Sequence, residues 1–122
     1  MPDLDLILSE GAALDADHRA ALAWRRIGEK PSSITLKRAA TLLSAQTVRI
    51  EYSETMREHR GPSGNAMLRD LVVFGVRNQP AAAVVDTDIR ANDRFVLNGI
   101  EYQVMDLVTT LGEVQAHCEA IQ

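Results

Sequence analysis

The sequence predicts a mainly β, antiparallel domain that is preceded by one helix. Three observations carry this prediction. Ala, Leu and Arg dominate residues 11–27, most later segments alternate apolar and polar residues with a period of two, and Asn98-Gly99 separates two apolar runs. These features are typical of a helix, of strands with one buried face, and of a tight hairpin turn. One domain accounts for the length of 122 residues.

The helix is expected from Gly11 to Ile27. Gly28 stands where a helix commonly ends in a left-handed conformation, and Pro31 with the two serines after it is expected to form a linker. Four residues fall on one face at helical spacing, namely Leu14, Ala21, Leu22 and Arg25.

Two strands are expected after the linker. The segment "SITLKRA", which begins at Ser33, is the first. In "TVRIEY", Val48, Ile50 and Tyr52 alternate with polar or charged residues, so this strand should have one buried face.

Two further strands are expected nearer the C-terminus. "LVVFGV" is apolar on both faces and β-branched, which indicates a deeply buried, central strand, and Gly75 within it indicates a bulge or a close backbone approach. In "EVQAHCEAI", the period-two alternation favours a strand, although Val114, Cys118 and Ile121 also fit helical spacing.

The segment "DTDIRANDRFVLNGIEYQV" predicts compact turns followed by a hairpin. Asp86 and Asp88 are turn formers, and Asn98-Gly99 is suited to the positive φ angles of a type I′ turn. The turn fixes the register: Leu97 pairs with Ile100 and Phe95 with Tyr102 on the core face, and Val96 pairs with Glu101 on the other.

A long inserted loop is expected at "SETMREHRGPSGNA", residues 53–66. The segment is polar, contains Gly and Pro, and shows no periodicity. Because it is longer than the usual hairpin loop, we expect it to be functional or disordered.

Composition excludes several function classes. A net charge of −4 and a pI near 5.3 argue against a general nucleic-acid binder. The N-terminal apolar stretch is interrupted by acidic residues, so neither a membrane-spanning helix nor a signal peptide is expected, and the chain should stay in the cytoplasm where it is made. With Cys118 as the only cysteine, no internal disulfide forms.

No metal site is expected. Asp86, Asp88 and Asn92 superficially follow a calcium loop, but Arg90 occupies a ligand position and Leu97 replaces the closing glutamate, so a structural turn is favoured. The histidines, His18, His59 and His117, lie on three different predicted elements.

No catalytic or cofactor site is expected either. His117 and Cys118 should point to opposite faces of a strand, which disfavours a shared metal or a nucleophilic pair. "RGPSGN" lacks the Gly-Lys-Ser/Thr ending of a phosphate-binding loop. The sequence therefore predicts no enzyme and no cofactor.

A nucleic-acid or acidic-partner contact remains an alternative for the loop, where Arg57, His59 and Arg60 concentrate positive charge. Base stacking is disfavoured, because all four Phe and Tyr residues are expected on core faces: Tyr52, Phe74, Phe95 and Tyr102. The rival function is accordingly a monomeric SH3-like or OB-like adaptor.

Three stretches together resemble a known family: "SITLKRA" with "LSAQTVRIEY", then "LVVFGVRNQP", then "DTDIRANDRFVLNGIEYQV". They resemble the head-closure proteins of tailed bacteriophages, also called head-tail connector or stopper proteins. The likeness extends from Ser33 to the C-terminus, and "DTDI", "DRF" and "G-x-E-Y-x-V" carry most of it. Asn92 stands where Gly is expected, but Asn tolerates a left-handed backbone.

Residues 1–32 are expected to form an N-terminal helical arm, which is less typical of the family. The resemblance implies a small β-barrel over residues 33–122. It also implies a structural virion protein that assembles with itself into a dodecameric or hexameric ring in the phage neck. That ring would close the head between the portal or adaptor ring and the tail-terminator or tail proteins. Packaged double-stranded DNA would pass through it, and no membrane is involved. The implied channel loop comprises Arg57, Glu58, His59, Arg60, Gly61, Pro62, Ser63, Gly64 and Asn65.

Overall fold

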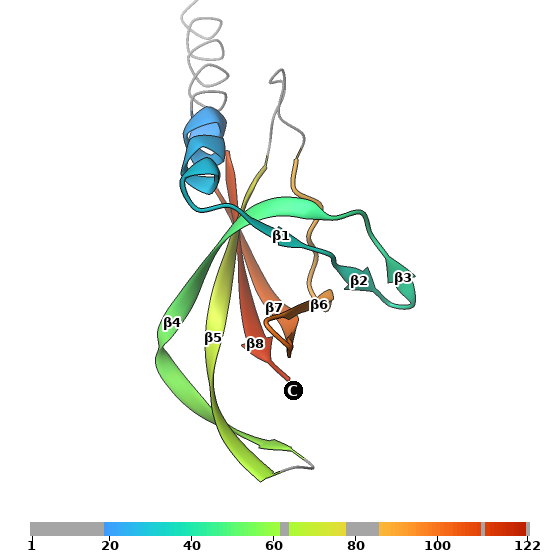
Figure 1. Ribbon diagram of the computed structural model, residues 1–122. Coiled ribbons are helices and arrows are strands. Elements are labelled where there is room, and N and C mark those ends of the chain that lie inside the picture. Colours follow the sequence, from blue (N-terminus) through green and yellow to red (C-terminus); the bar gives the residue numbers. More distant parts are fainter. Residues whose placement is uncertain (1–18, 62–63, 78–85, 111, 122) are drawn as a thin grey trace, which may run out of the picture.

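The computed structural model describes residues 19–61, 64–77, 86–110 and 112–121. Within them a helix at residues 19–29 precedes an eight-stranded sheet (Figure 1). The strands are β1 (Ser32–Ile34), β2 (Lys37–Arg38), β3 (Thr41–Leu42), β4 (Gln46–Gly61), β5 (Gly64–Val76), β6 (Arg94–Leu97), β7 (Ile100–Thr110) and β8 (Glu113–Ala120).

The sheet curls into an open half-barrel. Its strand order is β1-β4-β5-β8-β7-β6-β2-β3, and the described neighbours all pair antiparallel. Only Thr35 and Leu36 separate β1, at one end of this order, from β2, near the other end, so the two ends must approach each other. The prediction of a mainly β, antiparallel barrel with an N-terminal helix is confirmed.

The same closure explains why "SITLKRA" is not one strand. The chain pairs with β4 through β1, crosses to the opposite end of the sheet, and then pairs with β6 through β2. Leu36 lies at the crossing and is fully buried. Ala39 then adopts a positive φ of 54° in the turn between β2 and β3.

The barrel interior is lined by apolar side chains from most strands and from the segment before β6. The rings of Phe95 and Tyr102 stack with their centroids 5.5 Å apart, and the pKa of Tyr102 is raised, mainly by burial. Fully burying one Val, Leu or Ile side chain stabilises a fold by roughly 1.5–3 kcal/mol. The buried cluster consists of Ile34, Leu36, Val48, Ile50, Leu71, Val73, Ile89, Phe95, Tyr102, Val104, Val114, Ala116, Cys118 and Ala120.

The helix lies at one end of the barrel and buries a face of small residues. Ala20, Ala23 and Ile27 pack with Val76, not the face predicted from residues 14–25. This face is buried because the helix backbone lies very close to the β7–β8 turn. A Cβ at Gly112, in that turn, would lie 2.5 Å from the backbone nitrogen of Ala20. The expected end at Gly28 is also wrong. The helix extends to residue 29, and the φ of Gly28 is not positive.

The predicted β6–β7 hairpin is confirmed residue by residue. Phe95 pairs with Tyr102, and Leu97 pairs with Ile100. Asn98 and Gly99 have φ angles of 52° and 79°, as a type I′ turn requires. Since Val96 pairs with Glu101, the outer face also has the predicted register.

Two other strand predictions are also confirmed. β5 lies between β4 and β8, and a Cβ at Gly75 would lie 2.5 Å from Thr87 Oγ1, which accepts a hydrogen bond from the Val76 amide at 2.9 Å. The C-terminal segment is the strand β8 and not a helix. Tyr52 differs from its predicted core position: it is 41% exposed, it lies next to the register shift in β4, and its hydroxyl accepts a hydrogen bond from Asn98 Nδ2 at 3.3 Å.

The interpretation of residues 53–66 as a loop is wrong. β4 continues to Gly61 and β5 starts at Gly64, so the chain forms a long hairpin instead. This hairpin extends beyond the barrel (Figure 1), and the register shifts between Tyr52 and Met56, which interrupts the alternation of the barrel strand. Hydrogen bonding between two backbones does not by itself require apolar and polar residues to alternate in the sequence.

Candidate functional site

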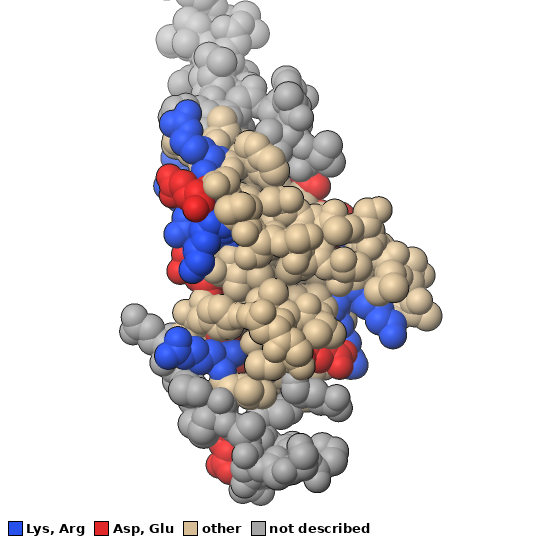
Figure 2. Space-filling view, in the orientation of Figure 1, with Lys and Arg blue, Asp and Glu red and all other residues tan. Residues whose placement is uncertain are grey.

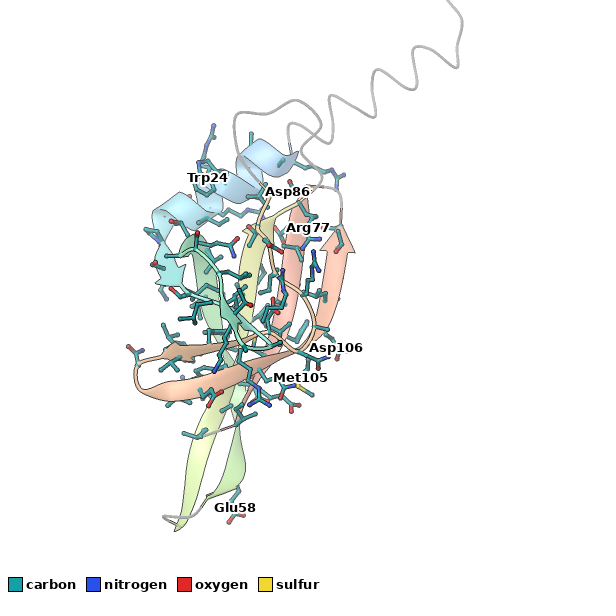
Figure 3. All side chains as sticks on the ribbon, turned by 90° about the vertical axis from the view of Figure 1, so that its right-hand side faces the viewer. Trp24, Glu58, Arg77, Asp86, Met105 and Asp106 are labelled. Carbon is teal, nitrogen blue, oxygen red and sulfur yellow. The ribbon has the colours of Figure 1, made fainter. Side chains whose placement is uncertain are left out.

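The most distinctive feature is the long end of the β4–β5 hairpin, residues 53–69, which we call the arm, as distinct from the N-terminal helical segment. It extends beyond the barrel (Figure 1), although Leu68 at its root still packs against the buried cluster. Its pairs run from Met56 with Arg69 to Gly61 with Gly64. The predicted channel residues therefore lie at its distal end. The Arg57, His59 and Arg60 backbones are in β4, those of Gly64 and Asn65 are in β5, and the Glu58 side chain is exposed (Figure 3). Pro62 and Ser63 lie outside the described residues.

The arm is a ribbon of two strands. β5 pairs with β8 only from Leu71 onward, and β4 pairs with β1 only between Gln46 and Val48. Among the described strands, none pairs with the outer edges of the arm. An isolated two-stranded ribbon is at best marginally stable in water, and unpaired edges readily accept another chain.

A groove of about 440 Å³ lies at the root of the arm, on the outer face of β4, β5, β8 and β7. One register row crosses all four strands there: Glu51, Val72, His117 and Asp106. The register shifts on both flanks, between Tyr52 and Met56 on β4 and at Met105 on β7. Bulges of this kind re-aim side chains, and Met105 is 41% exposed.

A second constellation fixes the turn before the last hairpin. The Arg38 guanidinium, on β2, donates to Asp93 Oδ1 at 3.1 Å and Oδ2 at 2.9 Å, and to Asp88 Oδ1 at 2.9 Å. We call these three residues the clamp. Asp93 is buried, whereas Asp88 is exposed. Arg38 holds the pKa of Asp88 below its usual value through their hydrogen bond, and the two carboxylates raise the pKa of Arg38.

Hydrogen bonds to the backbone complete this turn. Asp93 Oδ2 accepts from the Arg90 amide at 2.9 Å, and the Gln46 side chain both accepts from the Asp88 amide and donates to its carbonyl. Asn92 has a φ of 74°, so it does adopt the left-handed conformation expected of it. Asp86, also predicted as a turn residue, is exposed at the start of the segment (Figure 3).

The described residues do not assemble reactive groups. His117 is exposed and Cys118 is buried, so the predicted opposite orientation holds. Burial, with a smaller effect of the Asp70 charge, raises the pKa of the Cys118 thiol to about 12. No group of three or more potential metal ligands occurs in the described part of the chain. His18 lies outside it, and His59 is in the arm.

Charged side chains do not form a continuous basic surface on the face seen in Figure 2. Lys and Arg side chains lie at the margins of that face, next to Asp and Glu, and its middle is uncharged as far as the described residues show. Arg49 illustrates the mixing, since it pairs with Glu51 at 2.8 Å and with Glu29 at 3.6 Å.

The search of protein-family models finds no match to the chain, and the search of curated proteins finds none either. Of the helical residues that the structure describes, no stretch has the length and apolar character needed to cross a membrane.

Sequence reasoning missed the clamp. Arg38 and Asp93 are 55 positions apart, and each is an ordinary charged residue in its local segment. One signal for this cluster was present in the sequence. Asp93 directly precedes β6, whose Phe95 is buried, and a carboxylate in such a buried position needs a hydrogen-bonding or charged partner. Nothing local identifies Arg38 as that partner.

Proposed function

We propose that this chain is a structural virion protein of the phage neck, which assembles into a ring, closes the DNA-filled head and joins it to the tail. Two independent lines support the proposal. One is the resemblance of the segments from Ser33 onward to head-closure proteins. The other is the arm, which is the observation that carries most weight.

The arm supports assembly because it extends away from its own barrel (Figure 1). A ribbon that gains little stability from its own fold becomes useful when other copies cover it. In a ring, every copy contributes one arm near the axis, and many weak contacts act together at high local concentration. The arm tips would thus narrow or close the channel.

The charge distribution supports a passage for DNA. A net charge of −4 gives no strong attraction to phosphates, so a duplex would pass through such a ring without being held.

The deciding experiment uses the phage whose genome encodes this chain. A nonsense mutation in the gene should yield heads that package DNA, lose it on storage and fail to bind tails. Cryo-electron microscopy of complete particles should show the chain as a ring between portal and tail. Nonsense-mutant particles with stable, DNA-filled heads and attached tails would refute the proposal.

The same protein tests the rival adaptor function. A strict monomer that binds duplex or single-stranded DNA tightly at physiological salt, and that is missing from purified particles, would favour the adaptor. Within the described face, the mixed charges of Figure 2 do not favour that outcome.

A further inference from the structure

The groove at the root of the arm is a face of the sheet that the described elements leave open. His117 and Asp106 are exposed in it, and Met105 extends from the bulge on β7. We propose that this groove receives the arm of a second copy of the chain. The inference rests on the proposed function, because a ring needs one contact that repeats from copy to copy.

Charge complementarity argues for this occupant. Four carboxylates line the groove, and none of its described lining residues is Lys or Arg. Three of the four have interactions within the chain: Glu51 is paired with Arg49, Asp70 accepts from the Ala120 amide at 3.4 Å, and Glu119 also has a partner, whereas Asp106 is exposed. The arm has the opposite balance: residues 53–69 contain three arginines and two glutamates, hence a charge of +1. The groove carboxylates are Glu51, Asp70, Asp106 and Glu119.

Apolar contact argues in the same direction. Met105 and Tyr52, which both line the groove, are each 41% exposed in the single chain. Large apolar side chains at a bulged edge gain stability when another surface covers them. The arm can supply such a surface, since it extends beyond its own barrel (Figure 1) and its sequence includes Met56 and Met67.

The distal part of the same chain's arm does not fill the groove. Of the described arm residues only Ser53, at the root, lines it, and the arm extends away from the barrel (Figure 1). Figure 3 shows Glu58 far along the arm, whereas Met105 and Asp106 lie on the side of the barrel. An arm on one copy and a groove on the next form a heterologous contact, which closes into a ring or continues as a filament.

The test is charge reversal, followed by sedimentation velocity at low salt. Asp106→Arg should weaken self-association at least about tenfold, and so should the double substitution Arg57→Glu with Arg60→Glu. Combining all three substitutions should restore association to within about threefold of the natural chain. Raising the salt from about 0.05 M to about 0.5 M should weaken it as well, because exposed charges are screened.

Asp86→Arg is the matched control. It makes the same charge change at an exposed position near the helix end of the barrel (Figure 3), and it should alter association less than about twofold. Equal effects of Asp106→Arg and Asp86→Arg, a triple variant that stays dissociated, or a natural chain that remains monomeric at its highest soluble concentration would each overturn the inference. None of these results decides the neck function, which depends on the particle images.

Discussion

Replacing Arg38 by alanine should lower the free energy of unfolding by about 3 kcal/mol. The substitution leaves the buried Asp93 carboxylate without its cation, and removing one partner of a buried pair costs about 3–5 kcal/mol. The Arg90 amide still donates to Asp93, so the lower end of this range applies. The Asp88 pair adds at most about 1 kcal/mol, because that carboxylate is exposed.

Thermal unfolding measures this loss directly. With an unfolding entropy of about 2.1 cal/mol/K per residue, 122 residues give about 0.26 kcal/mol/K, so 3 kcal/mol lowers the Tm by about 12 °C. Arg90→Ala is the control. Arg90 is 70% exposed and its Nε lies 3.9 Å from Asp88, so its loss should shift the Tm by no more than about 2 °C. Equal shifts for the two variants would refute the role of the clamp.

The clamp also predicts a pH dependence. In the folded chain, Arg38 lowers the pKa of Asp88, so this carboxylate contributes stability above its unfolded pKa of about 3.9, and the contribution is lost as the pH falls through the lowered folded value. Arg38→Ala lacks that contribution. The difference in Tm between the natural chain and Arg38→Ala should therefore narrow as the pH falls below about 4.

Three further predictions concern single residues. At pH 8, Cys118 with a pKa of about 12 should present roughly a thousandfold less thiolate than an unfolded thiol, so a disulfide reagent should label it only in urea; rapid native labelling would contradict this. Gly75→Ala should lower the free energy of unfolding, measured by urea titration, by about 1–3 kcal/mol, because the added Cβ meets the Thr87 side chain. Adding Thr87→Ala to this variant should restore part of the lost free energy. Gly99→Ala should lower the free energy of unfolding by about 1–2 kcal/mol, because Gly99 has a positive φ that alanine adopts only with strain. An unchanged free energy of unfolding would contradict a left-handed conformation at this turn.

Local signals predicted the C-terminal half of the fold well. Asn98-Gly99 fixes a turn type, and the turn type fixes the register of the strands beside it, so β6 and β7 required no knowledge of the rest of the chain. β8 was predictable for a similar reason. Its alternating residues all meet one barrel interior, which leaves the period in the sequence.

Features set by distant segments were not predictable from local patterns. The break after Ile34 exists because the chain must cross from one end of the sheet to the other. The face of the helix is selected by its close approach to Gly112, which is more than eighty positions away. The partner of Asp93 is likewise set by the closure of the barrel, which brings β2 beside β6.

The arm shows why a local prediction can be wrong for a segment that extends beyond its own barrel. A strand that packs on its own core carries the pattern of that core, and a strand that packs on another molecule need not. Residues 53–66 look like a loop in the sequence because they are polar and show no periodicity, yet the backbone is paired from Met56 with Arg69 to Gly61 with Gly64. Among the described strands, none covers the outer edges of this ribbon, and unpaired edges readily accept another chain. If the proposed neighbour contact is correct, the arm should exchange its amide hydrogens rapidly in the monomer and slowly in the ring, while those of β8 stay protected in both.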